Sequence, residues 1–386
     1  MSLLVRRLCR NIQKDYRINL IAGAEGLDNK VVWVHMIEDC EVAEFLHGNE
    51  VILSTGIGNL ANDTKLMEFV KKLHSSNASA VMINIGPYIK SIPKEIIDYC
   101  NEVKLPLYTI PWEVKLVDLT RKFCQMLIES EEKEKSLTSL VKDYLFKPQE
   151  RDKVYGELTR NGFAQHLNYC VIISGIVRNG QLSTDSNDKE LLHGYLEREI
   201  GKITNNYCIF QHDNKYACII AGVNTSLIKE LVKVIDKKSI SRQGKIHLAV
   251  SNNRENLFDM PKNFELADRM FKLIESLNQT PLIYDDLGIY KILLSVSEQK
   301  VMKDYEKEVI GALEEYDEGN GTDFMDFIRI FIKNGGNIQQ VANAMYVHRN
   351  TIHYKINRIK EISGLNLSEL DDILKVALCL QIMNLR

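Results

Sequence analysis

The chain has 386 residues, 45% of them hydrophobic and 26% charged, which is the composition of a globular protein with two to four domains. Its formal net charge of −3 excludes a general attraction to nucleic acid, so any DNA binding has to come from a local basic surface. There is no apolar run of about 18 residues, no signal-peptide core at the start and no CxxC pair among the eight cysteines, so we expect a cytoplasmic protein without a membrane partner, metal site or cofactor.

Residues 1–112 alternate between strand-like and helix-like segments. The strand patterns are short and rich in Val, Ile and Leu, and they cover 30–38, 50–56, 80–86 and 105–110. Helical periodicity fills 64–74 and begins again at Pro93. Strands that alternate with helices in this way predict parallel crossover units, and hence an α/β domain.

A ligand site in such a domain is expected at the carboxyl ends of the strands. The candidate ligand-binding residues are therefore His35 and Glu38 after the first strand, and Thr55 and Gly56 after the second. His35 could donate a hydrogen bond to a polar ligand and Glu38 could accept one. The alternative is that His35 is a structural histidine and that Thr55–Gly56 is only a turn.

The composition changes between 113 and 161. From Glu113 to Tyr144 there is no Gly or Pro, and charged residues dominate 129–135. Apolar residues recur at heptad positions, but Ser130 and Lys133 interrupt the series. This pattern predicts a connecting helix that could pair in a dimer. The alternative is an exposed spacer helix that is packed only at its ends.

Residues 162–286 form a second predicted α/β unit. Strand patterns cover 169–177, 207–211, 215–222 and 245–251, and helical patterns cover 191–200 and 264–277. The two central strands flank a predicted hairpin turn at His212–Asp213–Asn214.

Residues 287–386 are predicted to be all helical. A helix over 303–316 is expected to break at 318–321, and Thr322 is expected to cap the next helix, whose apolar stripe begins at Phe324. Ser368 is expected to cap the last helix.

Two closely spaced helices within this region predict a helix-turn-helix. Asn337 is a good N-cap for a short helix over 338–345, and 346–348 form the turn. A second helix runs from about Arg349 to Ile362 and ends before Gly364, as the helical periodicity and the glycine indicate.

The second helix has one apolar stripe and one polar face. Ile352, Ile356 and Ile359 fall on the stripe and are expected in the core. The other side carries amides, a hydroxyl, an aromatic ring and cations, which can hydrogen-bond base edges and phosphates. The candidate DNA-binding residues are Arg349, Asn350, Thr351, His353, Tyr354, Lys355 and Arg358. The alternative is an ordinary solvated amphipathic helix.

The stretch from Val347 to Ile359 resembles the signature that ends PucR/CdaR-family bacterial transcription regulators, with Ile352 for Leu, Lys355 for Arg and Ile356 for Leu. The N-terminal region resembles the sensory module of the same family. The matching residues are Trp33–His35, Glu38, Phe45–Leu46, Gly48, Glu50, Leu53, Thr55–Gly56 and Leu105–Leu107. The resemblance implies a ligand-sensing domain (1–112), a helical linker (113–161), a GGDEF-like domain (162–286) and a helix-turn-helix domain (287–386).

The middle region is similar to a degenerate GGDEF-like domain. A working cyclase carries a Gly pair and acidic metal ligands at the hairpin turn, whereas this chain has Asp213–Asn214 followed by Lys215. One remaining acid cannot assemble the metal site for phosphoryl transfer. We therefore expect this domain to be non-catalytic.

These features predict a ligand-responsive regulator of a purine, nitrogen or amino-acid operon, and not an enzyme. Its expected partners are double-stranded operator DNA, a small metabolite and a second copy of the chain, in a homodimer or larger homo-oligomer. One alternative is a nucleotide-binding or cyclase-like enzyme with accessory DNA binding. Another is that the C-terminal domain binds a protein instead of DNA.

Overall fold

The computed structural model describes residues 3–10, 12–237, 244–296 and 298–385. The described chain divides into two compact units. The first comprises 1–169, 184–235 and 255–261, and the second comprises 170–183, 236–254 and 262–386, each apart from the undescribed positions.

The N-terminal sheet of the first unit has five strands in the order β2 (Asn19–Ala22), β7 (Leu107–Pro111), β6 (Ala80–Ile85), β5 (Glu50–Ser54) and β4 (Trp33–Met36). The strands β4 to β7 run parallel, which confirms the predicted α/β domain. The interior strand β5, between β6 and the edge strand β4, is buried along its whole length, as its continuous apolar run favours. The antiparallel edge strand β2 was not predicted, because it is short and has little alternation.

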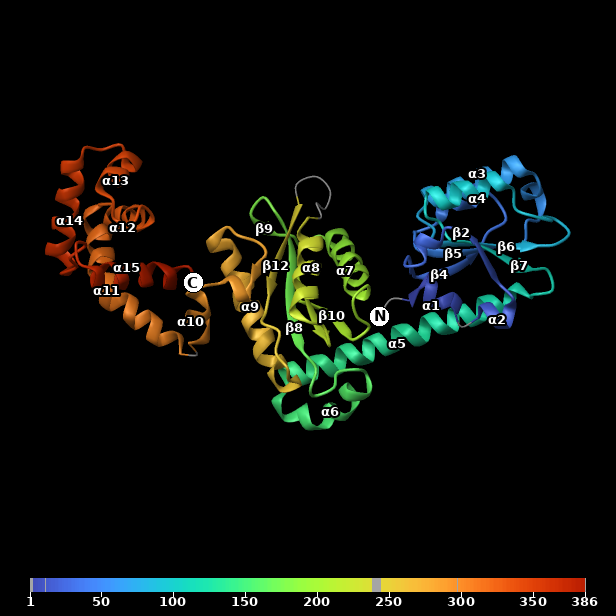
Figure 1. The fold of residues 1–386 in the computed structure, drawn as a ribbon, viewed down its shortest axis with the longest axis horizontal. Coiled ribbons are helices and arrows are strands. Elements are labelled where there is room, and N and C mark those ends of the chain that lie inside the picture. The colour runs from blue at the N-terminus through green and yellow to red at the C-terminus, as the bar shows by residue number, and fades with distance from the viewer. Residues whose placement is uncertain (1–2, 11, 238–243, 297, 386) are drawn as a thin grey trace. The chain divides into compact units, whose positions relative to one another are not determined.

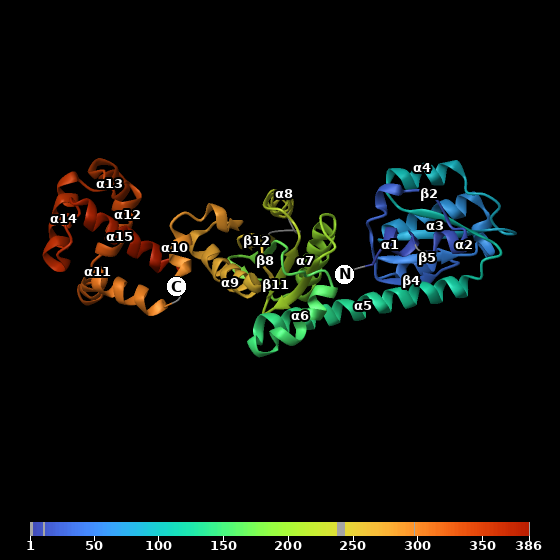
Figure 2. The ribbon, with the colours of Figure 1, turned by 60° about the horizontal axis from the view of Figure 1, so that its bottom comes forward.

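Helices cover both faces of this sheet (Figures 1 and 2). On one face, α3 (Asp63–Ser75) and α4 (Lys94–Glu102) pack with Val81 and Ile83. On the other face lie β1 (Leu3–Leu4), α1 (Val5–Arg10) and the start of α5 (Leu116–Phe146), while α2 (Gln13–Tyr16) and β3 (Lys30–Val31) complete that layer.

The predicted linker is a single helix, α5, of 31 residues. Leu119 and Phe123 are fully buried against the N-terminal sheet, and Val141 and Tyr144 are buried near the other end. Both ends are thus packed within the chain, as in the spacer alternative. Pairing of α5 in a dimer stays a prediction. Helix α6 (Arg151–Arg160) follows α5.

The first unit also contains α7 (Ser186–Gly201), β10 (Tyr207–His212), β11 (Lys215–Ala221) and α8 (Thr225–Asp236). Strands β10 and β11 form the predicted hairpin, in which His212 pairs with Lys215 across Asp213–Asn214. Asp213 has a φ of 53°, a left-handed conformation that Asp and Asn tolerate in tight turns. Helix α8 was not predicted.

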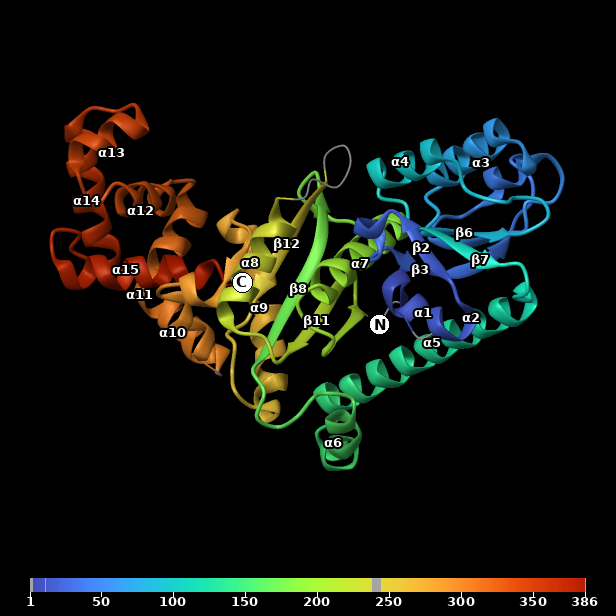
Figure 3. The ribbon, with the colours of Figure 1, turned by 45° about the vertical axis from the view of Figure 1, so that its right-hand side comes forward.

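The second unit contains most of β8 (Tyr169–Arg178), together with β9 (Gln181–Leu182), β12 (Gly244–Val250), α9 (Met260–Leu277) and β13 (Leu282–Ile283). Strand β12 is antiparallel to β8 and parallel to β13. The rest of this unit is helical and comprises α10 (Tyr290–Ser295), α11 (Gln299–Asn320), α12 (Phe324–Lys333), α13 (Ile338–Met345), α14 (Arg349–Ser363) and α15 (Leu370–Met383). Figure 3 shows α13 and α14 joined by a short turn beside α12.

Three helix boundaries in this part differ from the sequence predictions. The helix α11 continues through the expected break and ends at Gly321, whose φ is 63°. Thr322 does not cap α12, because the Asp317 carboxylate accepts hydrogen bonds from the backbone N–H groups of Phe324 and Met325 at 3.0 and 2.8 Å. Ser368 does not cap α15, which starts at Leu370 and has no side-chain cap at the preceding Glu369.

Candidate nucleic-acid interface

The two helices α13 and α14 each begin at a side-chain cap; the cap at Asn337 was predicted, whereas His348 was predicted only as part of the turn. The Asn337 Oδ1 accepts a 3.1 Å hydrogen bond from the Gln340 backbone and starts α13. His348 starts α14, and its Nδ1 accepts a 3.3 Å hydrogen bond from the Asn350 backbone. Gly364 ends α14 with a φ of 77°, a conformation that favours glycine.

The buried side of α14 holds the helix in the core of the C-terminal helices. Ile352 and Ile359 are fully buried beside Phe327 and Val341. Ile356 was also predicted to lie in the core, but it is only half-buried at the margin of the same cluster.

The opposite side of α14 is open to solvent. Arg349, Asn350, His353 and Tyr354 are exposed, Tyr354 to 65%, and Thr351 is half-buried. The exposed groups include a guanidinium, a carboxamide and a phenol, which can hydrogen-bond phosphates or base edges. These five residues lie on or beside one accessible face, and their contact with DNA stays a prediction.

Lys355 does not project from that face as expected. Its ammonium bonds the Asp323 carboxylate and lies 5.3 Å from the ring centre of Phe324, and its side chain is only 15% exposed. The intramolecular ion pair and the aromatic contact hold the Lys355 side chain against α12, and its contact with DNA stays a prediction.

Arg358 reaches the edge of the exposed face but is also held in place. Its guanidinium donates to the Tyr316 hydroxyl at 3.0 Å and to the Glu361 carboxylate at 2.6 Å. The guanidinium carbon also lies 5.5 Å from the Tyr316 ring centre. The hydrogen bonds to Tyr316 and Glu361 raise the pKa of Arg358 above its ordinary value. Arg358 is thus oriented by α11, which no local sequence pattern indicates.

Tyr346 in the turn is an exposed aromatic residue that the sequence analysis treated only as part of the turn. Its side chain is 96% exposed, and its backbone is left-handed with a φ of 57°. Glycine fits this conformation with less strain than tyrosine. A large exposed side chain at a strained turn beside α14 is a reason to consider Tyr346 as part of the interface.

The ligand site predicted at the ends of β4 and β5 is not an open donor and acceptor pair. The Glu38 carboxylate accepts hydrogen bonds from the Thr55 backbone and hydroxyl, both at 2.7 Å, and from the Ser54 hydroxyl and Gly56 backbone at 2.9 and 3.1 Å. These bonds engage both carboxylate oxygens within the chain, and the role of Glu38 and Thr55 as ligand contacts stays a prediction. His35 is exposed on the edge strand, and Gly56 has a φ of 76° in the turn.

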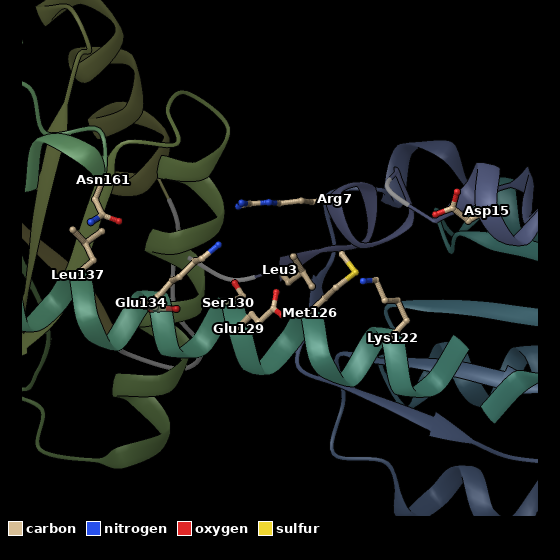
Figure 4. Close-up of a pocket in the computed structure, with 11 residues that line it drawn as sticks. Leu3, Arg7, Asp15, Lys122, Met126, Glu129, Ser130, Glu134, Leu137 and Asn161 are labelled. Carbon is tan, nitrogen blue, oxygen red and sulfur yellow. The ribbon is translucent and has the colours of Figure 1, made fainter. Parts of the chain in front are cut away.

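A cavity of about 500 Å³ lies instead beside α5 (Figure 4). Charged side chains of both signs line it, among them Arg7 of α1, Asp15 of α2 and Lys122 and Glu129 of α5. Ser130 and Lys133, which interrupt the heptad pattern, also line it. Except for Ser130, these charged and polar residues are exposed, so this cavity is an open, solvated groove.

Two features are absent from the described residues, 3–10, 12–237, 244–296 and 298–385. No group of three or more His, Cys, Asp or Glu side chains in those ranges is arranged to hold a metal ion. No helix in the same ranges is long and apolar enough to cross a membrane.

A short capped helix, a tight left-handed turn and a second helix with an exposed polar face define a helix-turn-helix domain in the C-terminal region. Comparison with family models agrees with this class. The PucR C-terminal helix-turn-helix domain matches 324–382, and the purine catabolism regulatory protein-like family matches 11–127. The chain therefore carries the two terminal domains of PucR-type regulators, which confirms the resemblance at both ends. The GGDEF-like character of the middle region stays a prediction.

Similar proteins include the proline-responsive transcriptional activator PutR of Bacillus subtilis, with 26% identity over 127 residues (32% of this chain and 31% of PutR). The purine catabolism regulatory protein of the same organism is 29% identical over 101 residues, or 26% of this chain and 19% of that protein. The carbohydrate diacid regulator of Escherichia coli is 44% identical over 48 residues, 12% of each chain. The chain thus matches less than a third of the length of each of these relatives.

Proposed function

We propose that the protein is a DNA-binding transcriptional regulator of a metabolic operon. The observation that carries the proposal is the exposed face of α14, where Arg349, Asn350 and Tyr354 stand together on a helix that two buried isoleucines fix in the core. The terminal family matches support it, as do relatives whose names describe transcriptional activators and regulators.

In the proposed complex, α14 enters the major groove. Asn350, Tyr354 and Arg358 face base edges, while the Arg349 side chain approaches a phosphate. Thr351 and His353 flank this face. A homodimer would present two copies of α14 to half-sites about 34 Å apart. Tyr346 would lie beside the sugar-phosphate backbone.

We further propose that a small metabolite regulates this binding. The support is the PucR-type N-terminal domain and the name of one relative, which describes a response to proline. We propose no enzymatic activity for the middle region.

The proposal is tested by titration of duplex DNA, selected by the full chain from a random pool, with parent and variant proteins. Asn350→Ala should weaken binding by about tenfold, since a good bidentate base contact contributes ~1–3 kcal/mol of discrimination. Arg349→Ala should reduce the slope of log affinity against log salt concentration by about one.

Arg121→Ala is the matched control, because it removes the same charge from an exposed position on α5. This variant should bind like the parent. If the Asn350 and Arg349 variants also bound the DNA as tightly as the parent and with the same salt dependence, the result would contradict the proposal.

A further inference from the structure

The last helix, α15, exposes an apolar strip that the functions considered above do not use. Leu370 and Leu374 are 70% and 59% exposed. Ile373 and Ala377 continue the strip and are half-buried. The four positions follow the spacing i, i+3, i+4 and i+7, which places them along one side of the helix. We call these four residues the α15 seam.

The other side of α15 anchors this helix to α14. Val376 and Cys379 are fully buried in the same hydrophobic cluster as Ile352 and Ile359 of α14. At about 100° per residue, Leu370 lies about 120–180° around the helix from Val376 and Cys379, so the seam faces away from this core. Because α14 and α15 share one core, a partner that binds the seam is held at a fixed position relative to α14.

The seam is uncharged, which restricts what it can bind. Its four side chains are aliphatic, and the charged residues beside it on α15, Asp371 and Lys375, form an ion pair with each other at 2.8 Å. An exposed aliphatic strip offers no group to a phosphate or a charged ligand. It complements a second uncharged strip, which an identical seam provides.

We propose that the α15 seam binds the seam of a second copy of this chain, with the two helices antiparallel about a twofold axis. With the axis between Ile373 and Leu374, Leu370 of each copy packs over the small Ala377 of the other, and Ile373 packs beside the other Leu374. Every seam residue is then covered by a seam residue. This inference rests on the proposed function, for which it supplies the contact that brings two copies of α14 together.

The size of the seam predicts a weak dimer. From Leu370 to Ala377 the seam is about 10 Å long. It therefore supplies far fewer residues than the roughly 20–30 that each partner contributes to a standard interface. We expect the contact to be weak between free copies and to become effective when one DNA duplex holds two copies side by side at a high effective concentration. The interface should therefore appear most clearly as cooperativity in DNA binding.

Binding of the full chain to its selected duplex, and to a duplex cut to one half-site, tests the seam. The second copy of the parent should bind the full duplex at least about tenfold more tightly than the first. Leu374→Glu should lose this cooperativity, because like charges would meet at the axis. Leu191→Glu is the control, since it adds the same charge at a leucine of α7 that is 55% exposed. This control should keep the cooperativity, and both variants should bind one half-site within about twofold of each other.

A mixture of variants identifies the second copy as the partner. Leu374→Lys alone should also lose cooperativity. An equimolar mixture of the Glu and Lys variants should regain it, because opposite charges would then lie next to each other across the axis. Full cooperativity in the Leu374→Glu variant, or no recovery in the mixture, would overturn the interface.

Sedimentation of the full chain without DNA separates this inference from the proposed function. Across micromolar concentrations, the dissociation constant of the Leu374→Glu dimer should be at least about tenfold higher than that of the parent dimer. A parent that shows this difference but binds no DNA would contradict the proposed function and leave the interface intact. A parent that stays monomeric and also binds DNA without cooperativity, or equal dissociation constants for parent and variant, would overturn the interface.

Discussion

The Arg358 guanidinium donates a 3.0 Å hydrogen bond to the hydroxyl of Tyr316, 42 positions earlier in the chain. Arg358 also donates to Glu361, the only acidic residue of α14. The cation that is proposed to contact DNA is therefore shared between an orienting phenol and a competing carboxylate.

This arrangement predicts opposite effects for two neighbouring substitutions. Arg358→Ala should weaken DNA binding by about tenfold, whereas Glu361→Gln should strengthen it by roughly threefold, because it removes a negative charge that repels phosphates and competes for Arg358. Fluorescence anisotropy titrations at one fixed salt concentration measure both effects. A loss of affinity in the Glu361 variant would contradict this account.

Substitution of Tyr346 should change DNA affinity without a comparable change in the stability of the fold. Tyr346→Gly relieves a left-handed backbone, a gain that the greater freedom of glycine in the unfolded chain partly offsets, so the free energy of unfolding should stay within about 1 kcal/mol of the parent. DNA affinity should nevertheless fall by several-fold, because the exposed ring is lost. Thermal melting and anisotropy measure the two quantities. Unchanged affinity would remove Tyr346 from the interface.

The isoleucines of α14 predict a graded loss of stability. Ile359→Ala or Ile352→Ala should lower the free energy of unfolding by about 2–5 kcal/mol, since both residues are fully buried. Ile356→Ala should lower the free energy of unfolding by less, about 1 kcal/mol, because Ile356 is only half-buried. Urea unfolding followed by far-ultraviolet circular dichroism measures these losses. Equal losses at 356 and 359 would contradict the burial of the helix.

The Glu38 carboxylate predicts a structural effect in the N-terminal domain. Glu38→Gln replaces one acceptor oxygen by a donor amide that faces hydrogen-bond donors, so it should destabilise the domain by about 1–3 kcal/mol. Both tryptophans of the chain, Trp33 and Trp112, lie in this domain, so urea unfolding followed by tryptophan fluorescence reports it. Glu41→Gln, a change at a nearby exposed acid, is the control and should be neutral.

Much of the fold could be predicted from the sequence, because helix caps, helix ends and strand patterns are determined by residues that are close together in the chain. The cap at Asn337, the stop at Gly364 and the alternation of strands and helices in the N-terminal domain each depend on residues a few positions apart. The end of α11 and the cap of α12 were predicted less well, because Gly319 is tolerated inside α11 and Asp317 caps α12 from the preceding helix.

The chemistry of the candidate interface was predicted only in part, because it depends on contacts between residues that are far apart in the sequence. Helical periodicity places Lys355 and Arg358 on the polar side of α14, but their partners Asp323 and Tyr316 lie more than thirty residues away. Likewise, the sequence places Glu38 near the Thr55–Gly56 turn but does not show that the turn occupies both carboxylate oxygens.

The most direct test of the central claim is the salt-dependent affinity of the parent and of an Asn350→Ala/Tyr354→Ala variant for duplexes that the parent selects from a random pool. We predict that the parent enriches a discrete sequence with two half-sites about one helical turn apart and that the variant loses its preference for this sequence over unrelated DNA. A parent protein that enriches no sequence, or a variant that keeps the full preference, would contradict the claim that the exposed face of α14 reads DNA.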